Sequence, residues 1–288
     1  MIEILMAYEP WTRLAAFAGV FIVMALWELR RPKRQLSLGR RRRWPSNLGV
    51  VVLDSIVVRV LFPTAAVSVA VACEARGWGL FNWLGLPKGV AIPVSVLVLD
   101  LAIYLQHVLF HAIPMLWRLH RMHHADLDID VTTGVRFHPI EIVLSILIKF
   151  GVVAAIGAPA LAVLVFEVLL NATSMFNHSN VRMPPPVDAL VRWLVVTPDM
   201  HRVHHSIIRA ETDSNFGFNF PWWDRLFGTY RAQPAQGHQG MTIGIDKFRD
   251  PAELRLDRML TQPFRDDKGG RPLASDPADK TTPRSRGV

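Results

Sequence analysis

The sequence predicts an all-α integral membrane protein folded as a helical bundle. Hydrophobic residues make up 51% of the chain, and its mean hydropathy is positive at +0.24. Nearly uncharged apolar runs recur, several of them long enough to cross the ~30 Å hydrocarbon core of a bilayer as a helix. No stretch alternates convincingly between apolar and polar residues as a half-buried strand does. We therefore expect about four transmembrane helices and a helical cap outside the hydrocarbon.

The first apolar run extends from Trp11 to Leu29, and we expect a retained span rather than a removed signal peptide. The loop after it carries eight Lys or Arg residues between Arg30 and Arg43, which account for the whole net charge of +8. The positive-inside rule places this loop in the cytoplasm and the N-terminus outside. Because the positive charge is confined to this one loop, we expect the loop to bind anionic lipid headgroups. No nucleic-acid partner is expected.

Two further spans follow. Residues 47–72 form the second, interrupted by Arg59 and Pro63, and we expect Arg59 to face the bundle because an arginine in hydrocarbon is costly. Residues 91–113 form the third. Its polar residues, Asp100, Tyr104, His107 and His111, keep helical spacing and therefore share one face that leads to the cytoplasmic end.

The apolar run at residues 140–173 is too long for one span and is broken near Gly157. It is either a hairpin that enters and returns or a pair of tightly packed helices. In both cases the chain returns to the cytoplasmic side, where the earlier histidines already lie.

Histidines supply the main chemical signal. The chain has only eleven, yet the pattern HxxHH occurs twice, and residues three or four apart share a helical face. With one cysteine, Cys73, a thiolate cluster of the usual kind is excluded, so the metal ligands must be imidazoles. The histidines that line up in this way are His107, His111, His120, His123, His124, His201, His204 and His205.

Imidazole suits zinc, copper, iron and nickel, so the metal has to be inferred from ligand number. One zinc takes three or four protein ligands, whereas eight to ten histidines suit two ions. A zinc-dependent membrane hydrolase is one interpretation, although neither HExxH nor GxSxG occurs. A di-iron centre that activates O2 is another. A histidine-ligated haem carrier and a metal-binding protein without catalysis also remain open.

Between Asp100 and Tyr230 the chain resembles the fatty acid hydroxylase/sterol desaturase superfamily of membrane di-iron oxygenases. The resemblance rests on DLAIYLQHVLFH, LWRLHRMHH, DVTTGVRFHPIE, FNHSN, TPDMHRVHHS, ETDSNFG and WDRLFGTY. In several members one box is a histidine pair four residues apart, but the residue four before His178 is Ser174 here. His138 is therefore our candidate for the tenth ligand. The implied ligands are His107, His111, His120, His123, His124, His138, His178, His201, His204 and His205.

The resemblance implies two iron ions, O2 as co-substrate, and hydroxylation or desaturation of a sterol-like or fatty acyl lipid at the membrane face. It also implies a cytoplasmic catalytic cap. We expect an external electron donor, such as a reductase, a ferredoxin or a cytochrome b5-like protein, because the chain shows no GxGxxG after a strand and no fused haem domain. A zinc-dependent hydrolase acting on a lipid is the alternative.

We expect one membrane-embedded hydroxylase/desaturase domain over residues 1–261, with the histidine-box core at 100–230. Residues 262–288 are rich in Pro, Asp, Lys, Arg and Gly and poor in large apolar residues. That composition predicts a disordered tail.

Overall fold

The computed structural model describes residues 8–62 and 65–265, and within these ranges the protein is helical, with no β-strand. The predicted all-α fold is confirmed. Five segments are long and apolar enough to cross a membrane, rather than about four. They are α2 (Glu9–Arg30), the run Arg40–Trp83, α6 (Lys88–Ala112), α8 (Pro139–Ile156) and α9 (Ala160–Asn177).

The extra span comes from the stretch at residues 140–173, which forms two separate helices, α8 and α9. α8 ends at Gly157, which has a left-handed φ of +67° and lets the chain reverse into α9. The run Arg40–Trp83 contains α3 (Arg40–Leu61), α4 (Ala66–Arg76) and α5 (Leu80–Trp83).

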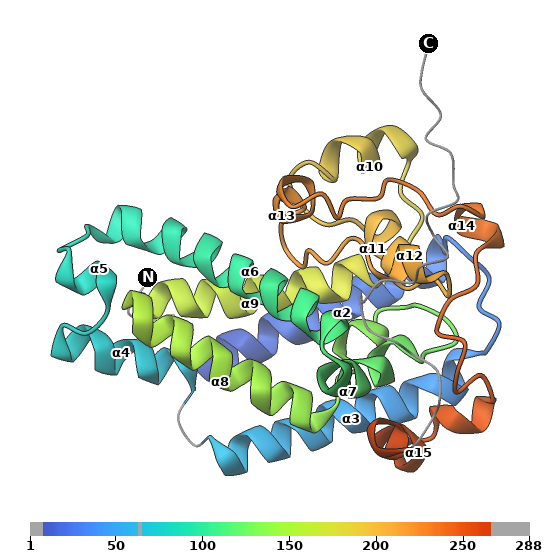
Figure 1. Ribbon diagram of the computed structural model, residues 1–288, viewed down its shortest axis with the longest axis horizontal. Helices are drawn as coiled ribbons and strands as arrows, with labels where there is room; N and C mark the ends of the chain where they lie inside the picture. The colour runs from blue at the N-terminus through green and yellow to red at the C-terminus, as the bar shows by residue number, and fades with distance from the viewer. Residues whose placement is uncertain (1–7, 63–64, 266–288) are drawn as a thin grey trace.

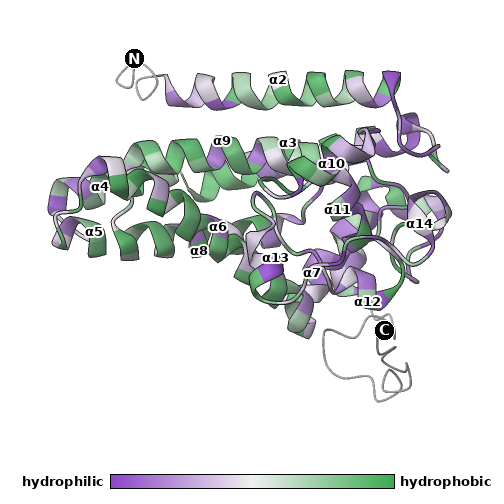
Figure 2. Cartoon of the chain, turned by 90° about the horizontal axis from the view of Figure 1, so that it is seen from above, coloured by the Kyte–Doolittle hydropathy of each residue, from purple (hydrophilic) through white to green (hydrophobic). Residues whose placement is uncertain are grey.

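Long apolar helices and short polar ones occupy opposite ends of the molecule (Figure 1). Helix α9 lies inside the bundle, against α2, α4 and α6, while α8 packs against α3 and α4. The outward faces are apolar, with Val60 72%, Ile22 56% and Leu147 50% exposed. Water would be a poor solvent for such a surface, and the hydropathy colouring of Figure 2 follows the same division. The chain is a multi-pass membrane protein.

The polar end is a cap that gathers segments from the second half of the chain around α7. Its helices are α7 (Pro114–His124), η1 (Thr133–Val135), α10 (Pro185–Val191), α11 (Pro198–His204), α12 (Arg209–Thr212), α13 (Trp222–Leu226), α14 (Gly237–Gly240), η2 (Pro251–Leu254), α15 (Leu256–Thr261) and η3 (Gln262–Phe264).

Arg43, in the first turns of α3, fastens the cap to the bundle. Its side chain is fully buried and bonds Asp126 at 2.7 Å and Asp130 at 2.5 Å. Burial alone would raise the pKa of Asp126, but the attraction of Arg43 and Arg136 outweighs it and lowers the pKa to about 2. The Asp126 carboxylate is therefore charged at neutral pH.

Other residues of the basic cluster are also tied to the cap. Lys33 pairs with Asp199 at 2.5 Å, and Arg34 donates to the Met241 carbonyl at 2.7 Å. Three side chains of the basic cluster therefore hold the cap together, and the expectation of a lipid anchor remains a prediction for the others. Four arginines remain exposed beside the cap: Arg30, Arg31, Arg41 and Arg42.

Arg59 is not buried in the bundle as we expected, although it lies on the wall of a cavity. Its side chain is exposed near the C-terminal end of α3, two residues before the helix ends at Leu61. At that position the long side chain can extend toward the membrane surface, which lowers the cost of its charge.

The ordered chain continues past residue 261, where we expected the tail to begin. Residues Gln262–Phe264 form η3, and the fully buried Gln262 bonds the Glu253 carbonyl oxygen at 3.1 Å. Residues 266–288 of the predicted tail lie outside the described residues.

Candidate metal centre

Nine histidines converge where the cap helices α7 and α11 meet the ends of α6 and α9. α6 contributes its last two turns, α7 its last two turns, α9 its C-cap residue, and α11 its last turn and C-cap. Helical spacing explains the convergence, since each set lies three or four residues apart and so faces one neighbour. The nine side chains are almost fully buried.

The nine histidines divide into two groups, within each of which the candidate ligand atoms lie no more than 4.8 Å apart. The two groups adjoin, because the rings of His124 and His205, one from each, stack at 4.6 Å between centroids. This arrangement fits two neighbouring metal ions. The five-histidine group is His107, His111, His120, His124 and His204, and the four-histidine group is His123, His178, His201 and His205.

The protein fixes which nitrogen of each ring faces the group. In six histidines Nδ1 faces a carbonyl or carboxylate oxygen, which accepts its proton and leaves the Nε2 lone pair free. These partners hold the rings in place from outside, as is usual for metal-binding histidines. The Nδ1 partners are the carbonyls of Phe216 for His107, Arg136 for His123, Ser174 for His178 and Ser214 for His204, and the carboxylates of Glu141 for His120 and Asp213 for His111.

The Nε2 atoms approach one another closely in both groups. His120 Nε2 lies 3.1 Å from that of His107, and His178 Nε2 lies 3.1 Å from that of His123. With the protons on Nδ1, these pairs have no proton to share. An imidazole nitrogen sits roughly 2.1 Å from a bound metal, which places neighbouring ligands at right angles about 3 Å apart. The spacing therefore fits ligands around a common ion.

Burial keeps these imidazoles neutral, as metal ligands must be. It lowers the pKa of His120 and of His178 to about 3. The pKa of His204 is lowered well below its ordinary value by burial and then by neighbouring histidines. Several buried nitrogens, including Nε2 of His111 and of His204 and both nitrogens of His205, have no hydrogen-bond partner among the described residues. Unpaired buried polar atoms are costly, so these nitrogens fit a metal site.

His138 lies outside both groups. It is the N-cap of α8, where Nδ1 accepts from the Ile140 amide at 3.2 Å, and its Nε2 lies 3.3 Å from the Leu260 carbonyl. The tenth position is therefore not filled by this residue in the structure. Ser174 stands where a histidine pair would place its first member, and its carbonyl instead holds His178.

Two polar residues of α6, one and two turns before His107, form hydrogen bonds with the segment that positions His107. Asp100 accepts from the Trp223 indole at 2.8 Å, and the Tyr104 hydroxyl bonds Thr229 at 2.9 Å. Both partners belong to the segment that also supplies the Phe216 carbonyl to His107. The stripe predicted on this helix therefore supports the histidines indirectly, through the segment that orients His107.

The model of the fatty acid hydroxylase family matches residues 92–229, which contain all nine histidines. This part of the chain is a fatty acid hydroxylase domain, which supports the resemblance to the fatty acid hydroxylase/sterol desaturase superfamily. It is 30% identical over 149 residues to the ornithine lipid hydroxylase of Rhizobium tropici, covering 51% of this chain and 44% of that protein. No solved structure matches it.

Two further similar proteins are named for different substrates. Over 212 residues the chain is 26% identical to the alkylglycerol monooxygenase of Xenopus tropicalis, covering 73% of this chain and 46% of that protein. Over 146 residues it is 29% identical to the cholesterol 25-hydroxylase of Rattus norvegicus, covering 49% and 47%. The chain spans less than half of the length of each of these relatives.

Glu141 is a residue that sequence reasoning missed. Its carboxylate lies 2.6 Å from His120 Nδ1, and glutamine there can still accept that proton but carries no charge. We expect Glu141→Gln to weaken metal affinity by roughly 10- to 100-fold, the usual effect of losing such a partner. Metal titration of the purified variant measures this, with Glu74→Gln at the distant end of α4 as the control. Unchanged affinity would contradict the positioning role.

Proposed function

We propose that the protein is an O2-dependent di-iron oxidoreductase that hydroxylates or desaturates a lipid at the membrane face. The observation that carries this proposal is the pair of adjoining all-histidine groups at the end of a bundle of membrane-spanning helices. Lipid hydroxylases and monooxygenases among the relatives support it. The proposed ligands are the nine histidines of the two groups, without His138.

Ligand number favours iron over zinc. Zinc in proteins is almost always bound by four ligands or fewer, whereas five nitrogens converge in the larger group. Imidazole is a good ligand for iron. Bound there, an iron pair would supply the redox chemistry that an unreactive C–H bond requires. The protein itself holds the imidazoles neutral, orients them through Nδ1 and keeps the site buried.

A cavity of about 820 Å³ leads from the five-histidine group into the bundle. His107 and His120 line one end of it, and apolar side chains such as Phe110, Phe137 and Phe218 surround that end. A lipid chain in this cavity would reach the metal site past these apolar side chains. The aromatic side chains around that end would shield the reacting carbon from water.

Charge supports a cytoplasmic location of the cap. The exposed arginines Arg30, Arg31, Arg41 and Arg42 flank two spanning segments at the cap end, where the positive-inside rule places cytoplasmic residues. From that side, a separate reductase, ferredoxin or cytochrome b5-like protein would deliver electrons. We propose only that the electron donor docks on the cytoplasmic side of the protein.

Metal analysis of the detergent-purified protein tests the proposed function. We expect about two irons per chain, in line with the two nitrogen groups, and a Mössbauer spectrum of coupled iron in protein grown on iron-57. With an electron donor and a lipid extract, this protein should consume O2. Zinc alone, with iron unable to restore O2 consumption, would favour the lipid hydrolase instead.

A further inference from the structure

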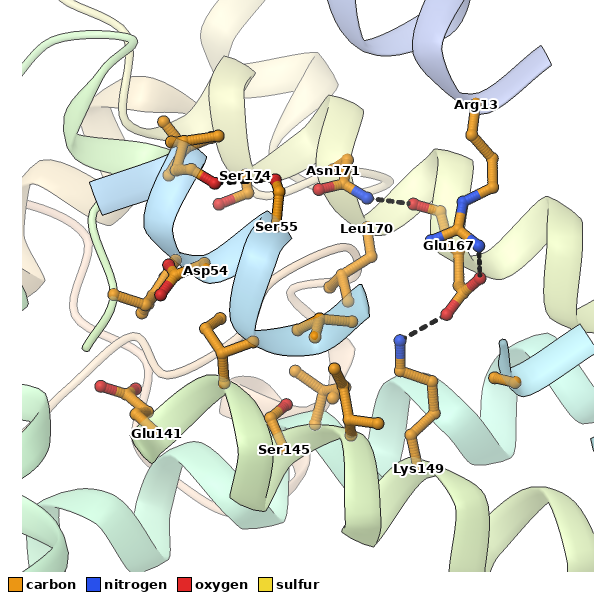
Figure 3. Close-up of a pocket in the computed structure, with 18 of the residues that line it drawn as sticks. Arg13, Asp54, Ser55, Glu141, Ser145, Lys149, Glu167, Leu170, Asn171 and Ser174 are labelled. Atoms are coloured by element: carbon orange, nitrogen blue, oxygen red, sulfur yellow. Dashed lines mark hydrogen bonds and ion pairs between the residues drawn. The ribbon is translucent and has the colours of Figure 1, made fainter. Parts of the chain in front are cut away.

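The cavity is lined by aromatic side chains at the histidine end and by four charged side chains at the opposite end. Figure 3 shows Glu167 of α9 between Arg13 of α2 and Lys149 of α8. Glu167 lies 2.5 Å from Lys149 and 3.0 Å from Arg13, and Arg13 also pairs with Glu9 at 2.8 Å. Only 5% of the Glu167 side chain is exposed. Charged groups this deep in membrane-spanning helices are costly and indicate a functional site.

The charged end and the histidine end lie on one face of α8. Glu141 contacts His120, and Ser145 and Lys149 follow it one and two turns later, all three lining the cavity. At a rise of 1.5 Å per residue, the eight residues from Glu141 to Lys149 span about 12 Å. Between them α8 also presents the apolar side chains of Ile142 and Ile146 to the cavity, while Asp54 and Ser55 of α3 are the polar residues on the facing wall.

This arrangement fits one orientation of an amphiphile. A methyl end placed against Lys149 and Glu167 would cover charged groups without offering a hydrogen bond, which is unfavourable. A hydroxyl can donate to the Glu167 carboxylate and accept from Lys149, whose ammonium has three N–H donors of which Glu167 takes one. The polar end of a lipid therefore belongs at the charged end, and its chain points toward the histidines.

The balance of charge selects an uncharged end group. Glu9 and Glu167 match Arg13 and Lys149, so the four-residue network is neutral as a whole. An uncharged hydroxyl leaves this balance intact, whereas a carboxylate would add a buried charge without a free partner in the network. Arg59 also lines the cavity wall, but its side chain is exposed.

We propose that the cavity binds a single-chain amphiphile with its uncharged, hydroxyl-bearing end at Arg13, Lys149 and Glu167 and its alkyl chain extended toward His107 and His120. The network then acts as a stop that sets the depth of the chain. If the proposed function is correct, the oxidised carbon lies roughly ten carbons from the polar end, the extended length that fits the ~12 Å separation.

Photo-crosslinking tests the orientation without requiring activity. The probes are 1-hexadecanols that carry a diazirine at carbon 2 or at carbon 10, applied to the full-length protein in detergent. We expect the carbon-2 probe to label residues 145–150 and 167–171, and the carbon-10 probe to label residues around Phe110 and Phe137. Reversed labelling, or the same labelling by both probes, would overturn the proposal. Crosslinking as expected without O2 consumption would reject the proposed function and leave this site standing.

A matched pair of variants tests the network itself. Lys149→Met keeps the length of the side chain and removes its donors, and Glu167 stays paired with Arg13. In this variant we expect the concentration of unlabelled 1-hexadecanol that halves labelling by the carbon-2 probe to rise roughly tenfold. A change of this size corresponds to the loss of one hydrogen bond to a charged group. In the control Lys88→Met, at an exposed lysine outside the cavity, 1-hexadecanol should compete with the probe as well as it does in the native protein. Equal competition by both variants, or tighter binding of hexadecanoate than of hexadecanol, would refute the assignment.

Discussion

Replacing His204 by alanine is expected to lower lipid oxidation by more than about 100-fold, because loss of an outer partner of a metal ligand already costs up to that factor. His204 is fully buried, its Nδ1 bonds the Ser214 carbonyl at 2.7 Å, and its Nε2 has no hydrogen-bond partner among the described residues. Alanine removes one of five converging nitrogens. Elemental mass spectrometry and O2 consumption together measure the effect.

The control for this variant is His138→Ala, at the histidine that caps α8 outside both groups. It should retain its metal and its activity apart from a small loss of helix stability, typically about 1 kcal/mol for a cap. A loss of metal as large as that in His204→Ala would show that His138 is a ligand after all. Retention of metal and activity in His204→Ala would reject the five-histidine group as a metal site.

Helical spacing predicted most of the candidate site because the histidines of one helix lie on one face whatever the rest of the fold does. The pairing between helices followed from topology, since every histidine-bearing segment returns to the same end of the bundle. Helical spacing could not place His138. It precedes Pro139 and begins a helix, so its ring serves the helix terminus instead of a helical face.

The contacts that orient the rings carry no local signal in the sequence. His107 depends on the Phe216 carbonyl and His204 on the Ser214 carbonyl, and a backbone oxygen has the same chemistry at every residue. Glu141 could have been suspected as a carboxylate at the start of an apolar helix. Its partner His120, however, is known only once α7 and α8 are packed together.

Charge was the least predictable feature of the fold. Composition marked residues 30–43 as one basic cluster, but Arg43 is buried and Arg42 beside it is exposed, because α3 turns one toward the cap and the other away. Likewise, Arg13, Lys149 and Glu167 come from three different helices, and only their packing shows that they form one network. The cavity between them was not predicted for the same reason.

The second large effect is expected at Arg43. Arg43→Met should lower the free energy of unfolding by about 3–5 kcal/mol, because it leaves the carboxylates of Asp126 and Asp130 buried without their main partner. Arg136 lies 3.7 Å from Asp126 and so compensates for part of this loss at Asp126. Denaturant titration of the detergent-purified variant, followed by tryptophan fluorescence, measures the change.

Arg42→Met is the matched control, since it removes the same charge from the neighbouring, exposed position and should change stability by no more than about 0.5 kcal/mol. Arg43→Lys should recover only part of the loss, because one ammonium lacks the fork that bonds Asp126 through two nitrogens and Asp130 through a third. If Arg43→Met were as stable as Arg42→Met, the cap would be held chiefly by its other ties, such as Lys33 with Asp199. Helices α6 and α7, which carry four of the five histidines of the larger group, would then keep their positions without the α3 anchor.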